Sequence, residues 1–101
     1  MSDAVTARTW TFLSNHAHVL ICVIDDPGVR VRDIAGRVGI TERAASAILG
    51  DLEGGGYLAR SRVGRRNRYD VDLGQPLRHP LESGRTVDDL LSMVTRMGNA
   101  S

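Results

Sequence analysis

The segment that most constrains the fold runs from residue 31 to residue 52 and reads VRDIAGRVGITERAASAILGDL. Its apolar residues recur at helical spacing in two blocks, which predicts one helix over residues 32–38 and a second over residues 42–53. Gly39 separates the blocks, and a glycine there can adopt the positive φ that a tight turn requires. Ala35 is small enough to let the two helices cross closely. The sequence therefore predicts two helices joined by a sharp turn.

Capping signals mark both ends of the second helix. Thr41 has a good N-capping side chain, and Glu42 places a negative charge at the positive end of the helix dipole. Glycines at positions 54–56 favour termination of the helix. The apolar positions expected to bury the two helices are Ile34, Val38, Ile40, Ala45 and Ile48. Together these features form a helix-turn-helix pattern.

The residues before this motif predict one more helix and a short strand. Apolar residues at helical spacing favour a helix over about residues 15–26, with Ser14 or Asn15 as its N-cap. The tripeptide VRV at residues 29–31 is expected to be a strand that pairs with a hairpin further along the chain.

That hairpin is predicted from two alternating segments, YLARSRV and RYDVDL, which bracket GRRN. If Tyr57 and Tyr69 share one face, the loop must contain an odd number of residues, and residues 64–68 satisfy this. In this register Arg62 lies opposite Asp70 and Arg60 lies opposite Asp72. The arginines then left unpaired at the tip are Arg65, Arg66 and Arg68.

The two ends of the chain are expected to contribute to assembly. Residues 74–85 form a linker rich in Pro and Gly, and Thr86 caps a last helix over residues 86–97 that carries an apolar stripe. Residues 1–13 form an aromatic arm before residues 14–73, which are expected to be the main domain. A small body has little room to cover both features, so we expect a homodimer. The residues expected at its interface are Trp10, Phe12, Val87, Leu90, Leu91, Val94 and Met97. The alternative, which the Pro/Gly linker permits, is that the last helix folds back onto its own chain.

The charge of the chain is concentrated in one place. The formal net charge is +1, but residues 60–68 carry +5 while residues 1–59 and 69–101 each carry −2. A local basic patch on a slightly acidic body is typical of a small phosphate-binding surface.

The order of these elements resembles the winged helix-turn-helix transcriptional regulators of the MarR/ArsR-like superfamily, over about residues 13–97. The resemblance implies an α+β fold with a three-helix core, a small antiparallel sheet with a wing hairpin, and a C-terminal dimerisation helix. It also implies that residues 42–53 are a recognition helix for the major groove of double-stranded DNA, and that a homodimer binds a near-palindromic operator.

The alignment of the motif implies which side chains meet DNA. On the recognition helix these are Thr41, Glu42, Arg43, Ser46 and Ala47, and Arg32 is a further candidate for backbone contact. Capping alone also explains Thr41. Ala44 and Ala47 lie at positions where many relatives carry longer polar side chains. Few side chains are therefore expected to contact bases directly, and the wing is expected to contribute more to DNA binding.

Other classes of site have weaker support. His16 and His18 lie two residues apart on a helix and cannot share a face, and the H-x-x-E pattern of His79 and Glu82 is interrupted by a proline. We therefore expect no metal site. Neither a nucleophile with a base nor a carboxylate pair stands out, so we expect no enzyme and no cofactor.

Two features favour a cytoplasmic protein that is not in a membrane. Cys22, the single cysteine, lies in an apolar run and is expected to be a buried thiol, as in a reducing compartment. The longest apolar run, Val19 to Ile24, has 6 residues, far fewer than the roughly 20 that cross a bilayer.

Two functions are consistent with these sequence features. The first is a sequence-specific DNA-binding regulator, with an unidentified small-molecule effector as an open possibility at the linker. The alternative is a winged-helix protein-interaction module that binds no DNA, suggested by the alanines on the recognition helix and the near-neutral net charge.

Overall fold

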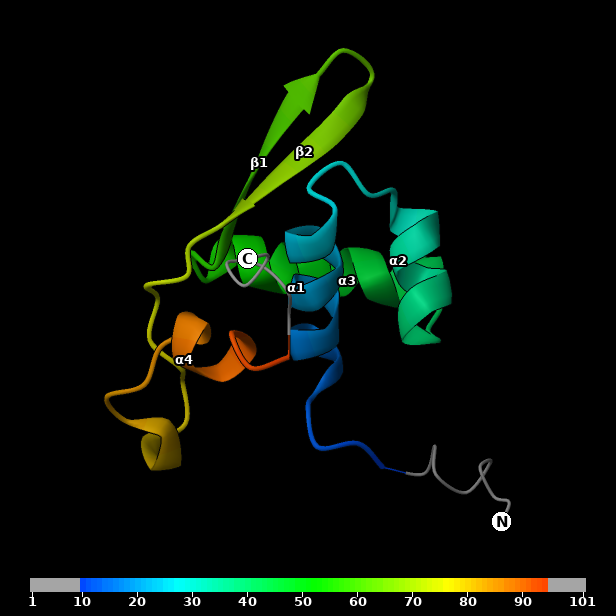
Figure 1. Cartoon of the computed structure of the whole chain (residues 1–101). Coiled ribbons are helices and arrows are strands. Elements are labelled where there is room, and N and C mark those ends of the chain that lie inside the picture. Colours follow the sequence, from blue (N-terminus) through cyan, green and yellow to red (C-terminus); the bar gives the residue numbers. More distant parts are fainter. Residues whose placement is uncertain (1–9, 95–101) are drawn as a thin grey trace.

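A computed structural model describes residues 10–94, and Figure 1 shows three helices packed together below a projecting hairpin. The elements in chain order are α1 (Asn15–Asp25), α2 (Val31–Val38), α3 (Glu42–Gly54), β1 (Leu58–Val63), β2 (Arg66–Val71), a 3-10 turn η2 (Pro80–Glu82) and α4 (Val87–Leu91). The three predicted core helices and the α+β class are confirmed. None of the helices in residues 10–94 is long and apolar enough to cross a membrane.

The core forms where α1 packs against α2 and α3. Ser14 caps α1, because its hydroxyl oxygen accepts a hydrogen bond from the Ala17 N–H at 3.3 Å. Val19 and Val23 on α1 are fully buried, as is Ile34 on α2. Burying these side chains supplies most of the stabilisation of such a small domain.

The turn between α2 and α3 has the predicted geometry. Gly39 ends α2 with φ 87° and ψ 36°, and its N–H donates to the Ala35 carbonyl at 2.8 Å. The Thr41 hydroxyl then accepts from the Ala44 N–H at 3.0 Å and caps α3. Both the positive φ at Gly39 and the N-cap at Thr41 are therefore confirmed.

The VRV strand was predicted wrongly. Val31 is the first residue of α2, and Arg30 occupies its N-cap position. Too few residues therefore remain before the helix to form a strand that pairs with the hairpin. A backbone hydrogen bond from the Tyr69 N–H to the Pro27 carbonyl, at 2.9 Å, connects β2 to the loop before α2. The sheet of the described residues contains two strands, β1 and β2.

The predicted hairpin register was also wrong. Val63 pairs with Arg66 across a turn of Gly64 and Arg65, and Gly64 has φ 65°. The prediction required Tyr57 to be part of the first strand, but Tyr57 lies before β1. Its N–H donates to the Leu52 carbonyl and its hydroxyl to the Pro76 carbonyl, so its burial says nothing about the faces of the strand.

The C-terminal segment folds back onto the core. The Thr86 and Asp89 side chains form a capping box at the start of α4, as predicted for Thr86, but the helix ends at Leu91 instead of continuing to residue 97. Val87 and Leu91 are each only 1% exposed within the chain's own core. These two side chains are therefore not part of an uncovered stripe. Leu90 is half-buried, Val94 is exposed, and Met97 lies outside the described residues.

Alanine substitutions at two glycines, three residues apart, test whether the turn requires the positive φ of Gly39. Gly39→Ala should lower the free energy of unfolding by about 1–2 kcal/mol, because alanine is strained at positive φ. Gly36→Ala is the matched control, since Gly36 lies inside α2 with open space around it and should raise stability by about 0.5–1 kcal/mol. Urea unfolding followed by circular dichroism measures both. Equal effects of the two substitutions would contradict the role assigned to Gly39.

Candidate nucleic-acid interface

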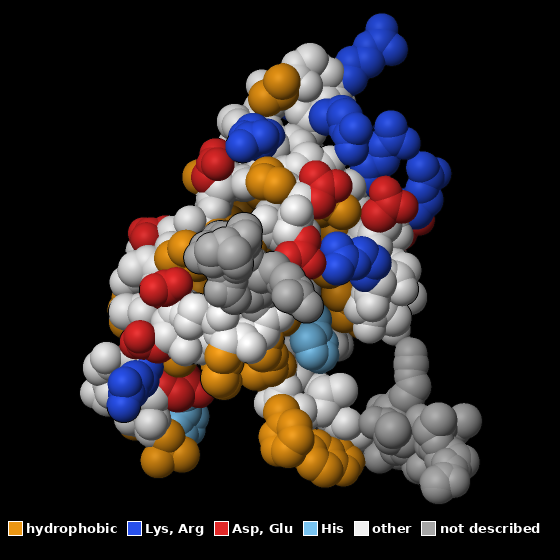
Figure 2. Space-filling model, in the orientation of Figure 1, with side chains coloured by type: hydrophobic (Ala, Val, Ile, Leu, Met, Phe, Trp, Pro, Cys, Tyr) orange, Lys and Arg blue, Asp and Glu red, His pale blue; other side chains and the backbone are white. Residues whose placement is uncertain are grey.

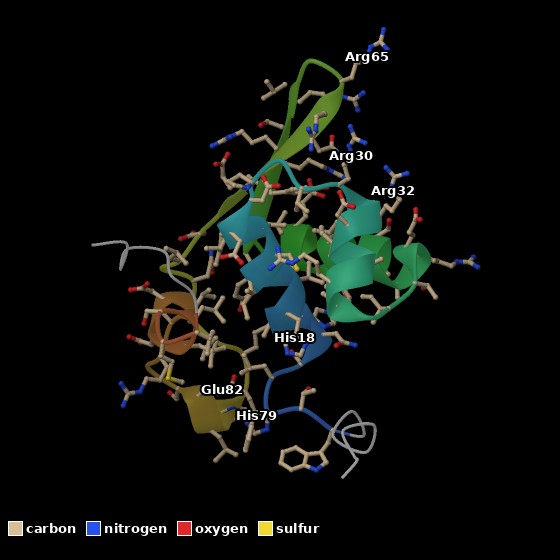
Figure 3. All side chains as sticks on the ribbon, turned by 45° about the vertical axis from the view of Figure 1, so that its right-hand side comes forward. His18, Arg30, Arg32, Arg65, His79 and Glu82 are labelled. Atoms are coloured by element: carbon tan, nitrogen blue, oxygen red, sulfur yellow. The ribbon has the colours of Figure 1, made fainter. Side chains whose placement is uncertain are left out.

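Arginine side chains form a row along one edge of the molecule. Figure 3 shows Arg65 at the tip of the hairpin, Arg30 in the loop below it, and Arg32 at the start of α2. In the space-filling view the blue side chains gather at the same upper edge (Figure 2). Arg65 and Arg32 were predicted from the sequence, but Arg30 was not, because the VRV tripeptide that contains it was expected to be a strand. The N-cap position directly before α2 is the signal that would have found it.

A groove of about 310 Å³ lies between the hairpin and the loop before α2, with Arg30, Arg65 and Arg66 in its lining. The Arg66 guanidinium crosses this region and donates from Nη2 to the Gly28 carbonyl at 2.6 Å. Arg66 had been expected to be unpaired, and this expectation was wrong. Its hydrogen bond connects the base of the hairpin turn to the helical body.

The observed register also changes the other ion pairs of the hairpin. Arg60 pairs with Glu53 on α3 at 3.0 Å, and Arg68 lies 4.0 Å from Asp70 on its own strand. The predicted pairs of Arg62 with Asp70 and of Arg60 with Asp72 were wrong, and so was the expectation that Arg68 is unpaired. Arg65 has no ion-pair partner among residues 10–94, so its charge is available to a ligand.

The other predicted DNA-facing residues lie at the N-terminal half of α3. Glu42, Arg43, Ser46 and Ala47 are all exposed, while Ala45 and Ile48 bury the opposite face of the helix. Thr41 is also exposed, but its hydroxyl already caps the helix. The exposed face thus presents the guanidinium of Arg43, a carboxylate, a free hydroxyl and a methyl group. The methyl group of Ala44 lies half-buried beside them.

The H-x-x-E pattern proves to be a local cap of η2. His79 Nδ1 accepts from the Leu81 N–H, and Glu82 Oε1 accepts from the His79 N–H, both at 3.0 Å. His16 Nε2 instead lies 2.9 Å from Asp51 on α3. Within residues 10–94, no three or more His, Cys, Asp or Glu side chains are grouped so that they could hold a metal ion.

Cys22 is buried, and this burial raises the pKa of its thiol above the ordinary value. The nearby Arg37 opposes that shift only in part, since its guanidinium is hydrogen-bonded to Asp25 at 3.1 Å. A raised pKa keeps the thiol protonated and unreactive. The structure thus supports a packing role for Cys22.

Comparison with known proteins identifies the fold but not a close relative. No protein-family model matches the sequence, and no curated protein is significantly similar to it. A MarR family protein of Mycobacterium tuberculosis, solved in complex with salicylic acid, matches the structure with a TM-score of 0.50 at 23% identity. The match covers 59% of this chain and 47% of that protein, so the chain spans about half of its neighbour's length. This likeness confirms the winged-helix fold.

The raised pKa of Cys22 gives a testable pH dependence. The folded protein holds the thiol proton more tightly than the unfolded chain, so this residue's stabilisation is present below about pH 8.5 and is lost as pH rises above it. Urea unfolding at pH 7.5 and 9.5 should show a larger loss of stability for the wild type than for Cys22→Ala. An equal loss in both proteins would show that Cys22 ionises as readily in the folded state.

Proposed function

We propose that this protein is a cytoplasmic, sequence-specific DNA-binding transcriptional regulator that acts as a homodimer on near-palindromic double-stranded DNA. The observation that carries the proposal is the row of arginines running from the hairpin tip to the start of α2, beside a helix-turn-helix. It combines a phosphate-binding edge with a helix of suitable size for the major groove. Neither catalysis nor a cofactor is part of this function.

Each element has a distinct task in this proposal. The exposed face of α3 enters the major groove, where Arg43 and Ser46 can bond to base edges and the Ala47 methyl group can contact a thymine methyl. The hairpin serves as the wing, and Arg65 at its tip meets the backbone or the minor groove. Arg30 and Arg32 lie where they would hold a phosphate between these two contacts. Few side chains then read bases directly, so DNA shape carries part of the specificity.

Loss of the wing arginines should change the salt dependence of binding. Fluorescence anisotropy with a duplex from the region upstream of the gene should show affinity that falls steeply with salt. Arg65→Ala should reduce the slope of log K against log salt by about 1 per subunit, and Arg65→Ala with Arg66→Ala by about 1–2. The matched control is Arg85→Ala, which removes the same charge from the loop before α4, far from the wing in Figure 1. If no duplex binds below about 100 μM at low salt, a protein-interaction module replaces this proposal.

Arg43 should carry sequence specificity. Arg43→Ala should cost about 1–3 kcal/mol on the preferred duplex and little on random DNA, because a contact to a base edge is lost. The same anisotropy titration on both duplexes measures the difference. Equal losses would show that Arg43 contacts only phosphate.

A further inference from the structure

A second hollow lies at the end of the molecule away from the wing. This cavity of about 650 Å³ lies between α1, α3 and the C-terminal segment. Apolar side chains line much of it, notably Leu20, Leu52 and Leu90. Its polar rim includes Asp51 and Glu82. A cavity of this size and character is large enough for aromatic side chains.

Two aromatic side chains that shortly precede Ser14, a residue of the cavity lining, are exposed. Trp10 and Phe12 are 67% and 92% exposed, and their rings contact each other edge to face with centroids 5.0 Å apart. The chain before α1 runs away from α4 (Figure 1). Large aromatic side chains seldom remain this exposed in a small protein unless another surface covers them.

We propose that the cavity of one protomer receives Trp10 and Phe12 from a second copy of this chain, and that the exchange is reciprocal. The proposal rests on the homodimer proposed above and specifies how that dimer is held together. Each cavity is then completed by side chains that its own chain does not supply.

The geometry permits a two-fold arrangement. Ser14, the N-cap of α1, lies in the lining of the cavity, and Trp10 is four residues before it. Four extended residues span about 13 Å, so a two-fold axis passing near the cavity mouth brings each arm to the other protomer's cavity. Because the arm and the cavity lie at the same end of the molecule, one axis satisfies both contacts.

The chemistry and the area also match. A buried indole N–H needs an acceptor, and the rim of the cavity offers the carboxylates of Asp51 and Glu82. Each aromatic side chain buries about 150–250 Å², so two arms contribute about 800 Å². The two cavities contribute less than the arms, and the total of about 1,200 Å² lies at the lower end of the range for stable interfaces.

The exchange would connect assembly with DNA binding. Gly50, Asp51 and Gly54 belong to the C-terminal half of α3 and line the cavity. The partner's arm therefore packs against the same helix whose N-terminal half is assigned to the major groove. In this way the arm sets the relative orientation of the two recognition helices.

The single tryptophan of the chain makes the exchange directly measurable. Sedimentation and tryptophan emission are recorded together from about 10 nM to 100 μM protein, which brackets the affinities of interfaces of this size. We expect the emission maximum to shift to shorter wavelength over the same concentrations at which the mass doubles. Acrylamide quenching should fall in parallel, as the indole leaves water.

Two variants and a matched control test the cavity itself. Phe12→Ala should weaken the dimer at least about 30-fold, the effect of losing an interface hot spot. Gly54→Gln places a side chain at the cavity without strain, since nothing lies within 4 Å of a Cβ there, and should also weaken the dimer. Gly36→Gln makes the same change on the open side of α2, outside the cavity, and should leave the dimer unchanged.

Three results would overturn the exchange. A blue emission from a protein of monomeric mass would place the arm in its own cavity, and a monomer throughout would leave the arm without a partner. A dimer that Phe12→Ala and Gly54→Gln leave intact would lie on another surface. A monomer that still binds an operator half-site with steep salt dependence overturns the exchange alone, whereas an arm-exchanged dimer that binds no duplex overturns the DNA-binding proposal alone.

Discussion

The position of the wing depends on Tyr69. This side chain is only 2% exposed, and its backbone N–H donates to the Pro27 carbonyl in the loop between α1 and α2. Arg66, three residues earlier on the same strand, donates to the carbonyl of Gly28 in the same loop. A hairpin alone is marginally stable and would point in many directions. These two contacts hold β2 against the helical body, and so place Arg65 in line with Arg30 and Arg32 (Figure 3).

The sequence was a good guide wherever the signals are local. Ser14, Gly39 and Thr41 act through hydrogen bonds or torsion angles within a few residues of themselves, and the three core helices accordingly agree with prediction to within one residue at each end. The hairpin register was beyond this kind of reasoning. It depends on Tyr57, whose burial comes from contacts with the end of α3 and with Pro76, far along the chain.

The basic surface was predictable in composition but not in detail. The excess of arginine in residues 60–68 is visible in the sequence, and it lies on the wing. Which arginines are available to a ligand depends on tertiary neighbours. Arg60 forms an ion pair with Glu53 on α3, and Arg66 donates a hydrogen bond to the Gly28 carbonyl. The same dependence explains the C-terminal segment, because the burial of Val87 and Leu91 by their own core cannot be read from an amphipathic stripe.

The construction of α2 has a consequence for the proposed contact with DNA. Of the three core helices, α2 is the shortest, and it is the one whose start no side chain caps. It is held in place by the burial of Ile34 and Ala35 more than by its own helical preference. Local opening and amide exchange concentrate in elements of this kind, so α2 can adjust by small rotations while α1 and α3 stay fixed. Arg32 at its first turn would follow such an adjustment, so its charge would be the more movable one between α3 and the hairpin.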